Sequence, residues 1–159
     1  MAGPRREGAD AYQRALGLLV RREHSRRDLT RKLAQRGVEP AEAEAAVERL
    51  AGQGYQDDQR FAESFARDRT AAGYGPVRIR VELSGHGLGE EAIARALEAC
   101  EADWPALARR QVARRWSAEA LADPARRRKA VEFLLRRGFD QDAAWGAVRG
   151  RPDEDDAFA

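Results

Sequence analysis

Hydrophobic residues recur along most of this chain at spacings of three and four, which is typical of helices with one buried face. Residues that favour helix starts precede these stretches, among them Ser25, Asp58, Asp103 and Asp123. Together the two signals predict an all-α fold of about nine helices. We expect them over residues 10–23, 26–36, 40–52, 58–72, 76–86, 90–101, 104–117, 125–137 and 140–149.

One stretch supports two structures. Residues 77–81 read Val-Arg-Ile-Arg-Val, and this alternation is typical of a half-buried strand. Pro76, however, stands where a first helical residue would stand, and a glycine follows about one helix length later.

An internal repeat favours the helix. Leu33, Leu83 and Leu134 are separated by 50 and 51 residues, and each is followed four positions later by a glycine and then an apolar residue. Glycine commonly ends a helix in the left-handed conformation, and the next apolar residue packs back onto the last turn. Because the first and third copies have helical spacing, the second should be helical too.

A repeat of this length indicates an array of similar modules. We predict three tandem three-helix modules over residues 10–52, 53–101 and 102–150. Residues 1–9 are expected to form a disordered N-terminal tail, and residues 151–159 an acidic C-terminal tail that could shield basic groups or mimic nucleic acid.

Charge is nearly balanced overall but sorted by helix. The chain has 29 basic and 27 acidic residues, for a net charge of +2, and all but two of the basic residues are arginine. The middle helices of the modules are strongly basic and the third helices acidic, which predicts a basic stripe for nucleic acid or an acidic protein surface. The helix dipole explains basic residues at helix ends, but not Arg26, Arg27 and residues 126–128, which stand at helix starts.

Residues with catalytic potential are few. His24 and His86 lack the companions of a zinc site, and the glycines at 85–89 lack the spacing of a dinucleotide loop. Trp104, Trp116 and Trp145 are predicted core residues. We therefore expect a protein that is not an enzyme, with no cofactor and no metal. The single cysteine and the lack of a signal or membrane segment predict a cytoplasmic location.

The second module carries a motif of a known family. It comprises a Gly-Tyr, an acidic pair, Arg-Phe-Ala, an aromatic residue, a later arginine, then glycine and Arg-Ile. These are Gly54, Tyr55, Asp57, Asp58, Arg60, Phe61, Ala62, Phe65, Arg69, Gly75, Arg78 and Ile79, with Ser25, Asp28 and Leu29 upstream. The chain thereby resembles the RecX family of regulatory proteins, bacterial modulators of the recombinase RecA.

The resemblance implies an elongated, curved array of three three-helix modules that acts as a monomer. It would lie in the groove of the RecA–single-stranded-DNA filament, inhibit RecA ATPase and strand exchange, limit filament growth, and bind single-stranded DNA more weakly by itself. The candidate contact residues are Arg26, Arg27, Arg31, Arg69, Arg78, Arg80, Arg127 and Arg128. Gly54, Tyr55, Asp57, Asp58, Arg60, Phe61 and Phe65 are instead assigned to the turn between the first two modules.

Two other functions remain open at this stage. A helical DNA-binding protein that acts without RecA would bind bare DNA tightly and with steep salt dependence, although no helix carries a clear base-reading set. A scaffold of helical repeats would show no dependence on nucleic acid.

Overall fold

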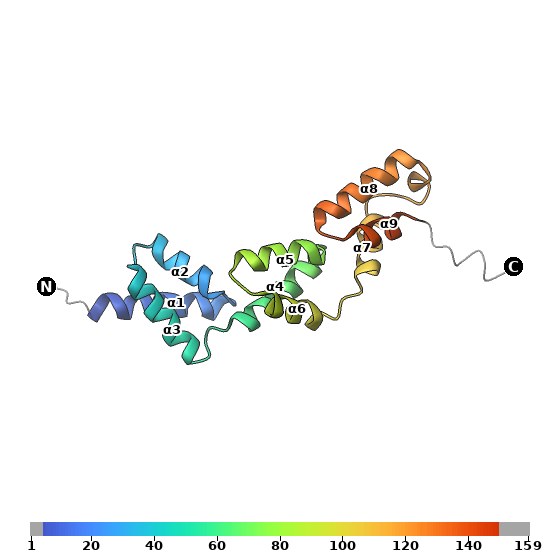
Figure 1. Cartoon of the computed structure of the whole chain (residues 1–159). Coiled ribbons are helices and arrows are strands. Elements are labelled where there is room, and N and C mark those ends of the chain that lie inside the picture. Colours follow the sequence, from blue (N-terminus) through green and yellow to red (C-terminus); the bar gives the residue numbers. More distant parts are fainter. Residues whose placement is uncertain (1–4, 150–159) are drawn as a thin grey trace. The chain divides into compact units, whose positions relative to one another are not determined.

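The computed structural model describes residues 5–149, and in this range it contains nine α-helices, one short 3-10 helix and no strand (Figure 1). The helices are α1 (Arg5–Arg21), α2 (Arg26–Gln35), α3 (Pro40–Gly52), α4 (Asp58–Ala71), α5 (Pro76–Gly85), α6 (Glu90–Ala99), α7 (Trp104–Ala113), η1 (Ala120–Ala122), α8 (Pro124–Arg137) and α9 (Gln141–Val148). The all-α prediction is confirmed. The acidic tail predicted over 151–159 and the first four residues of the N-terminal tail lie outside the described residues.

Two helix boundaries differ from the prediction by more than two residues. α1 begins at Arg5, so residues 5–9, expected in a tail, belong to the helix. They contain few apolar residues, so their hydrophobic pattern gave no helical signal. α7 ends at Ala113, four residues early, and Ser117 caps a new turn by accepting a hydrogen bond from the Ala120 amide at 3.1 Å.

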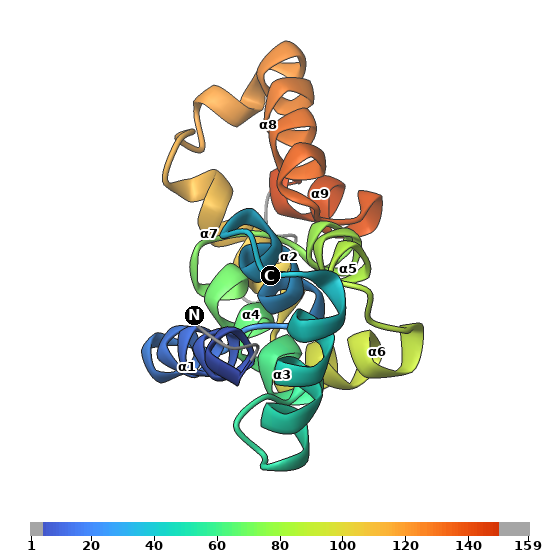
Figure 2. The ribbon, with the colours of Figure 1, turned by 90° about the vertical axis from the view of Figure 1, so that its left-hand side faces the viewer.

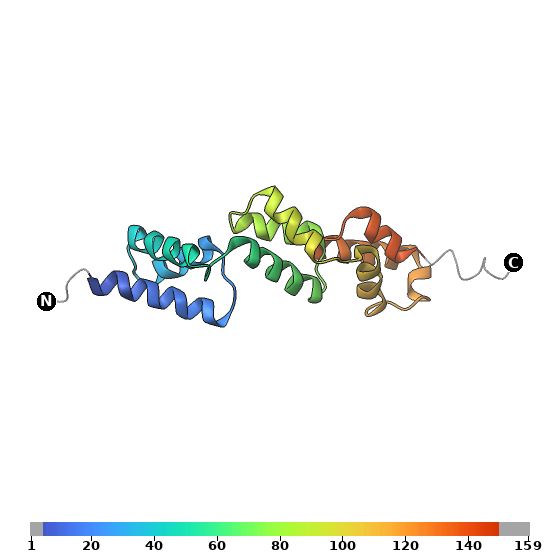
Figure 3. The same ribbon diagram turned by 90° about the horizontal axis from the view of Figure 1, so that it is seen from below.

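The first three helices pack around one hydrophobic core. α3 contacts both α1 and α2, and α1 and α3 run side by side in Figure 3. The buried residues of this core are Ala15, Leu29, Leu33, Ala43, Val47 and Leu50.

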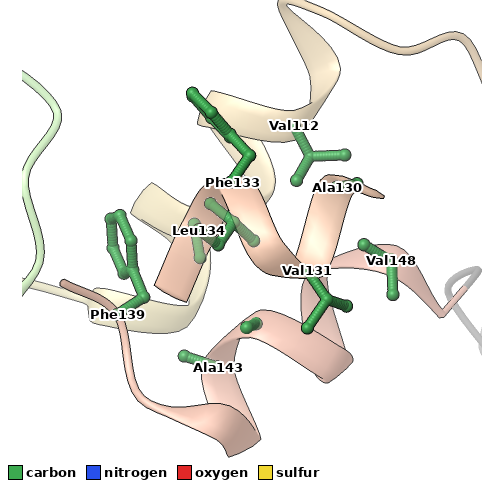
Figure 4. Close-up of a cluster of buried hydrophobic side chains, with 10 residues drawn as sticks. Val112, Ala130, Val131, Phe133, Leu134, Phe139, Ala143 and Val148 are labelled. Carbon is green, nitrogen blue, oxygen red and sulfur yellow. The ribbon is translucent and has the colours of Figure 1, made fainter. Parts of the chain in front are cut away.

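The last three helices enclose a second core. α9 packs against both α7 and α8, and Figure 2 shows α8 and α9 side by side. Figure 4 shows the core side chains, with Phe133 and Leu134 of α8 close to Val112 of α7. Trp104 and Trp116 pack against this core, but Trp145 is 38% exposed, so its predicted place in the core is wrong. The buried face of α9 is formed by Ala143, Ala144 and Val148, which turns position 145 outward.

The repeat glycines occupy equivalent turns. Gly37, Gly87 and Gly138 have φ values of +83°, +80° and +95°. The residue after each donates its amide to the carbonyl of the repeat leucine: Val38 to Leu33 at 3.1 Å, Leu88 to Leu83 at 3.4 Å, and Phe139 to Leu134 at 3.1 Å. This is the Schellman turn, and it explains why the glycine and the apolar residue recur together.

The ambiguous stretch at 77–81 is helical, as the repeat predicted. Ile79 is completely buried in α5, whereas Val77 and Val81 are 45% and 68% exposed. The alternation reflects exposed valines rather than a strand.

Packing divides the chain into two compact units. One comprises Met1–Phe65 with Leu83–Ala96, and the other comprises Ala66–Glu82 with Leu97–Ala159. Helices α4, α5 and α6 each contribute residues to both units. No helix in the described part of the chain is long and apolar enough to cross a membrane.

Candidate functional site

The Gly-Tyr of the motif forms the turn after α3. Gly54 has φ +80°, and the Tyr55 amide donates to the Leu50 carbonyl at 3.0 Å, which repeats the turn at the repeat glycines. The Arg60 guanidinium donates to the carbonyls of Gly54 at 3.1 Å and Tyr55 at 2.9 Å, and its Nε to Glu23 at 2.5 Å. The Glu23 hydrogen bond raises the pKa of Arg60. Arg60 therefore ties this turn to the connection between α1 and α2.

The acidic pair of the motif caps helices. Asp57 accepts the Arg60 amide at 3.0 Å at the start of α4. Asp58 Oδ1 accepts the Arg26 amide at 2.9 Å and Gln56 Nε2 at 2.9 Å, so one carboxylate joins the first turns of α2 and α4. Both carboxylates have backbone partners, which is the geometry of caps rather than of an acid–base pair.

A buried polar network lies beneath this contact between the first turns of α2 and α4, which we call a joint. Ser25 is completely buried and caps α2 by accepting the Asp28 amide at 3.0 Å. Asp28 is 7% exposed and is bonded to His24 Nδ1 at 2.9 Å and to Arg31 at 2.5 Å, with Lys32 Nζ at 3.3 Å. Burial alone would raise the pKa of Asp28, but these hydrogen bonds and the Lys32 charge lower it to about 2. Asp28 is therefore a carboxylate held ionised in the interior by basic partners.

His86 extends the network to the second repeat turn. Its Nδ1 lies 2.9 Å from Ser25 Oγ, and its ring packs on Phe61 and Phe65, with centroids at 4.7 and 5.5 Å. Since Ser25 Oγ already accepts from Asp28, its hydroxyl can donate to His86. Phe61 and Phe65 thus hold the His86 side chain in place, and His86 is hydrogen-bonded to Ser25, the capping residue of α2.

An equivalent joint lies in the other compact unit. The Gly75 amide donates to the Arg137 carbonyl at 2.9 Å, and the Val77 amide to the Gly138 carbonyl at 2.9 Å. A Cβ added to Gly138 would stand 2.3 Å from Arg78 Cβ and 2.6 Å from the Arg78 amide nitrogen. The start of α5 therefore packs directly on the backbone of the third repeat turn.

Three arginines surround Tyr74 beside this joint. Their guanidinium carbons lie 4.3 Å (Arg78), 4.8 Å (Arg137) and 5.6 Å (Arg69) from the ring centroid, within the range of cation–π attraction. Arg69 and Arg78 also pair with Glu82, at 2.8 and 3.0 Å. Sequence reasoning named Arg69 and Arg78 but missed Arg137. The signal was the repeat register, in which Arg36, His86 and Arg137 each precede the repeat glycine.

The eight predicted contact arginines fall into two groups. Arg26, Arg31, Arg69 and Arg78 each pair with a carboxylate of the chain. Arg27, Arg80, Arg127 and Arg128 pair with no carboxylate of the described residues, and Arg127 Nε is buried without a hydrogen-bond partner. The second group lies on α2, α5 and α8, the equivalent middle helices of the three repeats.

Comparison with known proteins agrees with this repeat structure. Three family models match: the first three-helix domain of RecX over residues 11–50, the second over 57–97 and the third over 101–148. The chain belongs to the RecX family. The resemblance drawn from the motif and the prediction of three three-helix domains are thereby confirmed.

Relatives and solved structures support the assignment to RecX. The chain is 54% identical over 142 residues to the regulatory protein RecX of Stenotrophomonas maltophilia (strain R551-3), covering 89% of this chain and 87% of that protein. It is 52% identical over 140 residues to that of Xanthomonas oryzae pv. oryzae (strain MAFF 311018), covering 88% of each.

Two crystal structures have the same fold. One, of a regulatory protein RecX, matches with a TM-score of 0.67 and 26% identity, over 86% of this chain and 69% of that chain. The RecX of Lactobacillus salivarius matches with a TM-score of 0.66 over 90% of this chain and 95% of that chain, at 20% identity. The RecX relatives are named regulatory proteins, and no cluster of metal-binding side chains is present among the described residues of this chain.

Proposed function

We propose that this chain regulates RecA by binding in the groove of the RecA–single-stranded-DNA filament, where it inhibits ATP hydrolysis and strand exchange and limits filament growth. The observation that carries the proposal is the set of arginines without a carboxylate partner. Each middle helix carries such an arginine: Arg27 on α2, Arg80 on α5, and Arg127 and Arg128 on α8. A repeating array of basic groups suits a repeating polyanionic partner.

Arginine suits this task because its planar guanidinium binds phosphates and carboxylates through two parallel hydrogen bonds. Arg27, Arg80 and Arg128 are exposed, so ionic contacts at these positions require little rearrangement of the fold. Several weak contacts on one chain add through effective concentration, so the whole chain binds a filament more tightly than any module would.

The contacts at the starts of α2 and α5 supply the second part of the mechanism, because they hold neighbouring helices together. A chain that contacts neighbouring RecA subunits through separate modules would hold those subunits in a fixed spacing. Such bridging would oppose ATP-coupled rearrangement of the filament and would thereby slow hydrolysis and strand exchange. Binding at a filament end would oppose further growth.

The second candidate is binding to DNA without RecA. The same arginines favour it, since unpaired guanidiniums bind phosphates of bare DNA as well. The two functions differ in their partner requirement, because only the first needs the assembled filament. In either case we expect a monomer in the cytoplasm that acts without catalysis or cofactor.

Charge reversal tests the proposal. Arg80→Glu should weaken binding to RecA filaments, assembled on single-stranded DNA with a non-hydrolysable ATP analogue, by about tenfold or more, since one charge-assisted hydrogen bond contributes about 1.5 kcal/mol. Arg14→Glu is the control, because Arg14 is also exposed, on α1, but already pairs with Asp10 at 3.2 Å. Cosedimentation measures the binding, and circular dichroism verifies the fold. Equal binding by the two variants would contradict the assignment of Arg80.

A further inference from the structure

An open groove lies beside the last described residue of the chain. Its apolar walls are formed by Val112 of α7, Trp116 just after α7, Leu121 of η1 and Val148 of α9. Arg109, Arg127 and Arg149 also line it, and all of these residues belong to one compact unit.

The three arginines of this groove have no anionic partner nearby. None of them forms an ion pair with another described residue. Arg127 Nε is buried without a hydrogen-bond acceptor, an arrangement that folded proteins rarely leave unsatisfied. A ligand for this groove should therefore carry several negative charges together with an apolar group for the walls.

The chain's own C-terminal segment has this chemistry. The ten residues after Arg149 read GRPDEDDAFA, with four consecutive carboxylates at 153–156 and Phe158 close behind. Arg149, the residue directly before this segment, lines the groove. At about 3.5 Å per residue, four to seven residues span roughly 14 to 25 Å, so the carboxylates can reach the arginines without a linker.

We propose that the C-terminal segment docks in this groove, with carboxylates of residues 153–156 on Arg109 and Arg127 and the Phe158 ring against the apolar walls. Arg127 is also a proposed contact of the filament. If the proposed function holds, the segment and an external polyanion compete for the third module, and the segment restrains binding until the filament displaces it.

Nuclear magnetic resonance of the full-length chain tests the docking without RecA or DNA. The reporter is the indole N–H of Trp116, which lines the groove, and the internal control is Trp145, which does not. Neutralising the segment with Asp153→Asn, Glu154→Gln, Asp155→Asn and Asp156→Asn should shift the Trp116 signal and leave Trp145 in place. Phe158→Ala, which changes no charge, should also shift Trp116.

A double-mutant design assigns the partner. In an Arg127→Gln background, the shift caused by neutralising the segment should be largely lost, because coupled groups are not additive. An Arg110→Gln background should preserve it, since Arg110 is the neighbour of Arg109 on α7 but does not line the groove. An unmoved Trp116 signal, or a shift that Arg127→Gln leaves intact, would overturn the proposal. A shift that grows with protein concentration would also overturn it, in favour of docking by the segment of a second copy.

Discussion

Replacing Gly138 with alanine tests the close approach between α5 and the third repeat turn. Two costs add at this position. An L-residue at φ +95° costs about 1–2 kcal/mol, and the new Cβ would stand 2.6 Å from the Arg78 amide nitrogen, a backbone atom that cannot rotate away. The backbone shift that makes room for the added Cβ typically costs about 1–3 kcal/mol more. Gly138→Ala should therefore lower the free energy of unfolding by about 2–5 kcal/mol.

Gly73→Ala is the matched control. Gly73 has φ +91° in the same type of turn and the same compact unit, but its added Cβ would meet only the side-chain amide of Gln111, at 2.4 Å. Because that side chain can rotate away, only the conformational cost of about 1–2 kcal/mol should remain.

Urea titration followed by tryptophan fluorescence measures both variants. All three tryptophans, at 104, 116 and 145, belong to the compact unit that contains Gly73 and Gly138. Equal losses for the two variants would refute the reasoning, because they would show that the backbone contact with α5 adds nothing.

Three further predictions concern the joints. Ser25→Ala should cost about 1–2 kcal/mol through loss of a buried cap, measured by urea titration with circular dichroism, whereas Ser84→Ala at an exposed site should cost little. Asp28 has a folded pKa of about 2, below its ordinary 3.8, so its contribution to stability is present above pH 4 and is lost as the pH falls toward 2. Asp28→Asn should therefore make the free energy of unfolding, measured by the same titration, depend less on pH between pH 4 and pH 2. An unchanged dependence on pH in this range would contradict the prediction. Arg137→Lys keeps the charge but loses the planar stacking on Tyr74 and Phe133, so it should cost about 1 kcal/mol of stability. Tryptophan fluorescence measures this cost with Arg136→Lys as the control, and equal costs for the two variants would exclude a stacking role.

The helices could be predicted because their signals are local. Asp103 and Asp123 accept the amides of Ala106 and Ala125, at 3.0 and 3.2 Å, so a capping residue in the sequence marks the helix start directly. The start of α1 has no comparable signal in its apolar pattern, so the sequence predicts it at residue 10, five residues after the observed start.

The joints depend on contacts between residues far apart in the chain. Ser25 and His86 are 61 positions apart, and no local pattern shows that their side chains meet. The repeat register gives a partial signal, because it aligns His86 with Arg137 before the repeat glycine, and both residues contribute to joints. Which arginines pair with carboxylates could not be predicted, since Glu82 satisfies both Arg69 and Arg78 only once helices α4 and α5 are folded against each other.

The most direct measurement of the central claim is DNA-dependent ATP hydrolysis by RecA, with this chain titrated well below one copy per RecA at physiological salt. A regulator that binds the filament should lower hydrolysis at such ratios while binding bare DNA weakly. No effect until the chain coats the DNA would contradict the account, because it would show simple competition for phosphates without a specific action on the RecA filament.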